Sequence, residues 1–146
     1  SRDRRVFVED IVRLQGSPSE VERLISDTAA RDGADVVQDF PQDPGQAGKA
    51  QRSAISRLLH GHEVHFSVET GSKEMRARPL AAQTENGNVF LVAAAWNDVF
   101  LREAEMFPMG YYKDQIDAAS RAYARLLRAR VQLVAAAPEI LGEATI

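Results

Sequence analysis

The chain has 146 residues, 45% of them hydrophobic, and a net charge of −3, which is the composition of an ordinary globular domain. It contains no cysteine, so disulfides, thiolate metal sites and cysteine nucleophiles are excluded. No apolar run approaches the roughly 18 residues of a membrane span, and no signal peptide is recognisable. We expect one domain over residues 1–137 and a frayed tail over 138–146.

The first elements are a strand and a well-capped helix. Residues 6–12 are rich in β-branched and aromatic side chains, which predicts a strand. Ser17 supplies a helix N-cap, Pro18 suits the first helical position, and Glu20 completes a capping box. Gly33 then ends the helix, because glycine readily adopts the left-handed conformation found there.

The middle of the chain repeats this strand–helix order. A second strand is predicted over 35–39 and a loop over 41–48. The helix that follows has its apolar stripe between Ala50 and Leu59 and is ended by Gly61. Residues 63–69 alternate strictly between apolar and polar side chains, which predicts a half-buried strand.

The second half predicts three helices and one strand. The ranges are a helix over 73–84, a turn over 85–88, a strand over 89–93, a helix that Asn97 caps and that runs through Met106 to a stop at Phe107-Pro108, and a last helix from Asp114 to about Ala136. In the last helix Ala122, Leu126 and Leu127 are expected to face the core, and Arg121, Arg125 and Arg128 the solvent. The alternation of strands and helices predicts an α/β fold with a partly parallel sheet.

Three aspartates are candidates for chemistry. Asp43 follows a predicted strand, and Gly45 and Gly48 let the backbone turn sharply and approach a ligand. Asp114 and Asp117 are three residues apart and so share a face of the last helix. Their oxygen atoms suit Mg²⁺ or Mn²⁺. The alternatives are turn chemistry for Asp43 and a favourable helix dipole for the other two.

Basic residues supply candidate phosphate contacts. Lys73, Arg76 and Arg78 follow a Thr-Gly-Ser turn and could hold a DNA backbone, or could form a solvated helix face. Lys49 follows two glycines, but their spacing is too short for a nucleotide-binding loop, and Ala50 stands where Ser or Thr would bind magnesium. Lys49 remains a candidate phosphate contact.

Several short segments keep a characteristic order and spacing along the chain. They are Gly16–Glu22, Gln42–Ala50, Thr70–Ala77, Gly87–Val89, Phe107-Pro108 and Asp114–Ala118. Together they resemble the C-terminal nuclease domain of phage terminase large subunits, the motor-nuclease that cuts and packages viral DNA. The resemblance implies a ribonuclease-H-like mixed sheet flanked by helices.

The resemblance also assigns roles. It implies cleavage of double-stranded DNA with two divalent ions, Mg²⁺ or Mn²⁺. Asp43 matches the family's second acidic ligand, Asp114 the second acid of its paired-aspartate motif, and Asp117 the acid three residues further on. The implied partners are DNA, the terminase ATPase domain, the small subunit and the portal, in the cytoplasm of a phage-infected or lysogenic bacterium.

Two departures from the family pattern affect the expected activity. Lys113 stands where the family usually has Asp, and the family's first catalytic aspartate belongs to an opening strand that we expect to lie upstream of Ser1. We therefore expect an incomplete site and weak or absent cleavage by this chain alone. A missing strand exposes sheet edges, which a second copy could cover as a homodimer. Glu9 or Asp10 could replace the missing acid.

Two other functions are compatible with the sequence. The first is a non-catalytic DNA-binding or assembly module of the same fold, with Lys113 filling the metal site. The second is a relative of Holliday-junction nucleases or transposases, which the segments Gly16–Glu22 and Thr70–Ala77 do not support.

Overall fold

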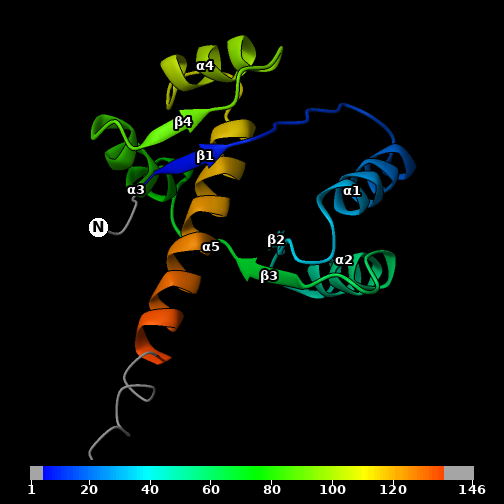
Figure 1. Cartoon of the computed structure of the whole chain (residues 1–146). Coiled ribbons are helices and arrows are strands. Elements are labelled where there is room, and N and C mark those ends of the chain that lie inside the picture. Colours follow the sequence, from blue (N-terminus) through cyan, green and yellow to red (C-terminus); the bar gives the residue numbers. More distant parts are fainter. Residues whose placement is uncertain (1–4, 137–146) are drawn as a thin grey trace, which may run out of the picture. The chain divides into compact units, whose positions relative to one another are not determined.

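Figure 1 shows a computed structural model of the chain, which describes residues 5–136. The predicted tail over 138–146 lies outside the described residues. The chain divides into two compact units. The central unit consists of residues 12–71, and the terminal unit combines residues 5–11 with residues 72–136.

The described residues form four strands and five helices. In chain order these are β1 (Val6–Val8), α1 (Pro18–Asp32), β2 (Gln38–Gln42), α2 (Gln46–Leu58), β3 (Val64–Val68), α3 (Lys73–Glu85), β4 (Val89–Leu91), α4 (Asn97–Met106) and α5 (Asp114–Ala136). Among them, no helix combines the length and the apolar character needed to cross a bilayer.

The central unit packs two helices on a pair of parallel strands. β2 pairs with β3 in a register that sets Gln38 opposite Val64. Its core is built from one apolar cluster contributed by α1, α2 and both strands: Ile25, Ala29, Phe40, Ile55, Leu59, Val64 and Phe66. The aromatic rings of Phe40 and Phe66 stack at 5.8 Å between centroids across the strand pair. Both pack against the buried residues Ala29, Ile55 and Leu59, so the strands and the helices share one core.

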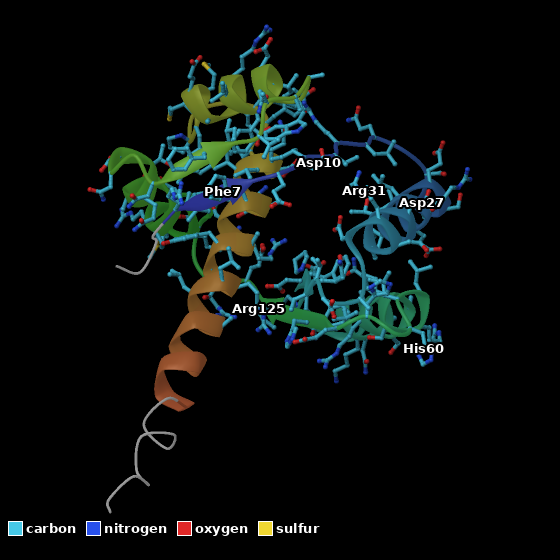
Figure 2. The ribbon with its side chains drawn as sticks, in the orientation of Figure 1. Phe7, Asp10, Asp27, Arg31, His60 and Arg125 are labelled. Atoms are coloured by element: carbon cyan, nitrogen blue, oxygen red, sulfur yellow. The ribbon has the colours of Figure 1, made fainter. Side chains whose placement is uncertain are left out.

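The terminal unit is organised around α5. β1 pairs in parallel with β4, and Val6 lies opposite Val89. One core cluster contains Val6, Leu80 and Tyr123, the other contains Ala77, Phe100 and Ile116, and Ala119 of α5 packs against both. On the other face of the strands, exposed Phe7 (Figure 2) stacks on Phe90 at 5.4 Å.

The α/β class and the parallel pairing are confirmed, although the described strands form two pairs. The predicted start of α1 is also confirmed. The Ser17 side chain accepts a hydrogen bond from the Glu20 backbone, and the Glu20 carboxylate accepts one from the Ser17 backbone N–H at 2.7 Å. Gly33 has a φ of 90° at the other end, where a residue with a Cβ would be strained.

Several predicted boundaries were wrong. β2 lies three residues later than 35–39, and α2 begins at Gln46, inside the predicted loop. Pro41 argued against a strand because it has no N–H to donate. The Gln38 N–H donates to the Glu63 carbonyl, so the backbone groups of residue 38 face β3. Backbone groups alternate in direction along a strand, so those of residue 41 face the other edge of β2, which has no partner among the described strands. β1 stops at Val8 because its partner has only three residues.

Two predictions about the helices were also wrong. Trp96, rather than Asn97, is the N-cap of α4, although the Asn97 side chain accepts a hydrogen bond from the Ala94 N–H. In α5, Ala122 and Leu126 are exposed, while the buried face runs through Ile116, Ala119, Tyr123 and Leu127. Arg121 and Arg125 are half-buried, contrary to the predicted solvent-facing stripe.

Candidate functional site

The start of α3 presents two cations on one helix face. Ser72 is the N-cap, and its hydroxyl oxygen accepts a hydrogen bond from the Met75 N–H at 3.2 Å. This cap fixes the first helical residue as Lys73. Arg76 lies three residues further on, so both side chains project from the same side of the helix.

A buried glutamate on α4 holds the start of α5. The Glu103 carboxylate accepts hydrogen bonds from the backbone N–H groups of Gln115 and Ile116 at 2.7 and 3.1 Å. It also accepts one from the Gln115 side chain at 2.7 Å. Free N–H groups at a helix start need acceptors, and a negative charge there is favoured by the helix dipole. Glu103 therefore fixes the turn that carries Asp114 and Asp117.

The two helix starts meet through ion pairs. The Lys73 ammonium donates to the Asp114 carboxylate at 2.6 Å. Arg76 donates to both oxygens of Asp117, at 2.9 and 3.0 Å from one terminal nitrogen and at 3.1 Å from Nε. Lys73 and Arg121 lie 3.8 and 3.9 Å from the same carboxylate. Four of the residues predicted from the sequence are thus brought together: Lys73, Arg76, Asp114 and Asp117.

The two aspartates differ in burial and therefore in chemistry. The side chain of Asp114 is 85% exposed, and that of Asp117 is 8% exposed. A buried carboxylate is tolerated where cations and hydrogen bonds compensate for lost water. Arg76 supplies this compensation in a two-oxygen geometry that strengthens and orients the pair. Asp117 is thus an anchor for Arg76, while Asp114 keeps oxygen atoms accessible to a ligand.

Asp43 lies in the central unit, at the carboxyl end of β2. It is exposed and precedes the turn into α2, where Gly45 has a φ of 99°. A Cβ at buried Gly48 would lie 1.9 Å from the Asp43 carbonyl oxygen, so only glycine lets the helix pack this closely against the turn. Asp114 and Asp117 belong to the terminal unit, and their convergence with Asp43 stays a prediction.

The other predicted contacts lie outside this cluster of ion pairs. Arg78 is exposed on α3, but two helical positions turn it about 200° from Arg76. Lys49 is exposed in the first turn of α2, in the central unit. Asp10 and Glu9 are exposed just after β1. Lys113 is half-buried directly before α5.

Neither the buried capping role of Glu103 nor the contact of Arg121 with Asp117 was predicted from the sequence. Glu103 lies three residues after Phe100 and four before Phe107, so it occupies the apolar face of its helix, and this pattern could have indicated a buried acid. Arg121 lies four residues after Asp117, a spacing that favours an ion pair on one helix face. Arg121 was predicted to face the solvent because Arg121, Arg125 and Arg128 recur at helical spacing.

The described residues supply only part of a binding site for a divalent cation. Within residues 5–136, no three acidic or histidine side chains gather closely enough to form a metal centre. Carboxylate oxygens of the kind that Asp43 and Asp114 expose suit Mg²⁺ or Mn²⁺. Asp117 does not fit as a ligand in this arrangement, because Arg76 already occupies both of its oxygens.

Comparison with known families decides what kind of domain carries this site. The family model described as a terminase RNaseH-like domain matches residues 1–126 of the chain. The chain belongs to this family. No curated protein and no solved structure matched it. Membership of the terminase RNase H-like family confirms the predicted resemblance and the ribonuclease-H-like fold class, and the match runs from before β1 into α5.

Proposed function

We propose that this terminase RNase H-like domain is a metal-dependent DNA endonuclease that acts in phage or prophage DNA packaging. The observation that carries the proposal is the cluster at the starts of α3 and α5. There an exposed carboxylate, Asp114, lies beside Lys73 and the Arg76–Asp117 pair. A phosphodiester carries negative charge that such cations hold, and the exposed acid can bind a divalent ion.

The residues of the cluster, together with Asp43 of the central unit, have distinct roles in this proposal. Asp43 and Asp114 would hold Mg²⁺ or Mn²⁺, which when bound activates water and stabilises the leaving oxygen. Lys73 and Arg76 contact the DNA phosphate, and Asp117 orients Arg76. Lys73 must exchange its contact with Asp114 for a phosphate when DNA binds, which an exposed pair allows at small cost.

Arg78 and Lys49 are further proposed phosphate contacts, since both side chains are exposed. Arg78 is turned about 200° from Arg76 on α3, so it would contact a different phosphate. The terminase ATPase domain, the small subunit and the portal are the proposed partners, in the cytoplasm of the bacterial host. Among the described residues β1 and β2 each pair with a single strand, which leaves an edge that a second copy could cover. Light scattering that detects only monomer would contradict the homodimer.

The nuclease proposal is tested by supercoiled-plasmid cleavage with Mn²⁺, comparing the chain with its Asp43→Ala and Asp114→Asn variants. The matched control is Asp98→Asn, which removes another exposed acid from the first turn of a helix. We expect weak cleavage by the chain alone, which both site variants lose and the control keeps. Cleavage retained in Asp114→Asn would overturn the proposed role of this residue.

A second candidate function is a DNA-binding or assembly module without catalysis. It is favoured by the ion pairs that neutralise Asp114 and Asp117 and by Lys113 beside them. Titration with Mn²⁺ distinguishes the two functions, since only the nuclease requires Asp43 for metal binding. If Asp43→Ala leaves the affinity for Mn²⁺ unchanged while the chain still binds DNA, the second function replaces the first.

A further inference from the structure

The loop between α4 and α5 carries an exposed group of apolar and aromatic side chains. Met109 is 88% exposed and Tyr111 is 92% exposed, and Met106 at the end of α4 is also exposed. Tyr112 packs edge-on against Tyr111 with the ring centroids 4.9 Å apart. Single exposed apolar residues are common, but a cluster of this kind marks a surface that contacts something else.

The loop is held in place at both ends. Its Gly110 is buried and donates a hydrogen bond to the Met106 carbonyl at 2.6 Å. Phe107 packs against the core cluster that contains Phe100 and Ile116. The following helix is fixed by Glu103. Met109 and Tyr111 therefore project from an ordered frame, so little conformational entropy would be lost on binding.

The surroundings of the loop favour an anionic ligand. Lys113 follows directly and makes no ion pair within the described part of the chain. Lys113, Glu103 and the residues of the ion pairs together comprise four cations (Lys73, Arg76, Lys113 and Arg121) and three carboxylates (Glu103, Asp114 and Asp117), which leaves one positive charge within this set. Apolar and aromatic side chains beside cations are the groups that contact bases next to phosphates.

We propose that Met109 and Tyr111 form a base-contacting wedge that enters the minor groove of double-stranded DNA beside the phosphate that Lys73 and Arg76 hold. Tyr111 and Asp114 are three positions apart in the chain, which limits the distance between their Cα atoms to about 11 Å. That distance corresponds to about three base steps of 3.4 Å. Wedges of this kind unstack one base step and bend the duplex, which sets a preference for deformable sequences. The inference rests on the proposed function for the identity of the ligand.

The wedge is tested by duplex binding in EDTA, where no cleavage occurs. Fluorescence anisotropy with a labelled duplex compares the chain with its Tyr111→Ala, Tyr111→Phe and Met109→Ala variants. The matched control is Leu126→Ala, an exposed apolar residue of α5 that lies 12 positions beyond Asp114, or about 18 Å along the helix.

We expect Tyr111→Ala to weaken binding by about fivefold or more, because the contact of an aromatic ring with a base is lost. Tyr111→Phe keeps the ring and should bind within about twofold of the original. The salt dependence of binding should stay the same in Tyr111→Ala, since its slope reports phosphate contacts alone. When the original chain binds a duplex that contains 2-aminopurine, the fluorescence of this base should rise because it is unstacked. Binding of Tyr111→Ala should not produce this rise.

Unchanged duplex affinity in both Tyr111→Ala and Met109→Ala overturns the wedge, and the loop would then serve a protein partner. This outcome is separate from failure of the nuclease proposal, which depends on Asp43, Asp114 and Mn²⁺. If Tyr111→Ala loses duplex binding while Asp43→Ala keeps its affinity for Mn²⁺ unchanged, the wedge proposal stands and the nuclease proposal is wrong. A changed salt slope in Tyr111→Ala also counts against base contact.

Discussion

The Glu103 carboxylate of α4 binds Gln115 of α5 twice, through the backbone N–H and the side-chain amide, each at 2.7 Å. Both residues are buried, so neither group can exchange its partner for water. The pair joins the two helices at the turn that carries Asp114. It therefore links the stability of the terminal unit to the geometry of the proposed site.

Glu103→Ala is expected to lower the free energy of unfolding by about 2–3 kcal/mol, because buried donors of Gln115 and Ile116 lose a charged acceptor. Urea denaturation followed by circular dichroism measures the change. Glu105→Ala is the control, since this exposed acid of the same helix should change stability by less than about 0.5 kcal/mol. Equal effects of the two substitutions would contradict the capping role of Glu103.

Arg76→Met is expected to destabilise the domain by about 2–3 kcal/mol, because it leaves the buried Asp117 carboxylate without its main partner. Lys73 and Arg121 lie within 3.9 Å and reduce the loss. The double variant Arg76→Met with Asp117→Leu should recover most of the stability, since no uncompensated charge remains buried. A double variant less stable than Arg76→Met would show that the buried charge is not the cause.

The sequence did not predict the pair of Arg76 and Asp117, although it identified both residues as candidates. The start of α1 was predictable because its cap is local: Ser17 and Glu20 bond each other within one turn. The pairing of Arg76 with Asp117 joins positions 41 residues apart. Local rules could assign each residue a charge and an element, but not a partner. Arg76 was therefore predicted to contact DNA and Asp117 a metal, while in this arrangement they bind each other.

The predicted position of β2 was wrong for a similar reason. The location of β2 depends on which backbone groups find a partner in β3, and the Gln38 N–H bonds the Glu63 carbonyl to start the pairing. Propensity favoured Val36 and Val37 and disfavoured Pro41. Tertiary pairing overrode propensity because Pro41 occupies a position where no N–H is needed.

Gly48→Ala tests the close approach of α2 to Asp43. In an exposed helix position this substitution would stabilise the domain by about 1 kcal/mol through helix propensity. Here the new Cβ would lie 1.9 Å from the Asp43 carbonyl oxygen, so the turn must move. We expect a lower melting temperature in a thermal denaturation experiment, together with weaker Mn²⁺ binding if Asp43 is displaced. A higher melting temperature would contradict the close packing.

The capping box of α1 predicts a dependence of stability on pH. Hydrogen bonds from the Ser17 backbone N–H and hydroxyl hold the pKa of Glu20 below its ordinary value of 4.5. Because the folded-state pKa is lowered, the stabilisation is fully present above about pH 4.5 and is lost as the pH falls through the folded-state value. Below that value the protonated carboxyl accepts these bonds less well in the folded state.

Glu20→Gln is the variant that isolates this effect, since it keeps the shape of the side chain and removes the charge. The difference in urea midpoint between the two proteins should be present at pH 7 and shrink as the pH falls below about 4.5. The control is Glu22→Gln, an exposed acid of the same helix for which no comparable cap exists. A Glu20→Gln difference that persists unchanged at pH 3 would mean that the carboxylate charge does not stabilise the helix start.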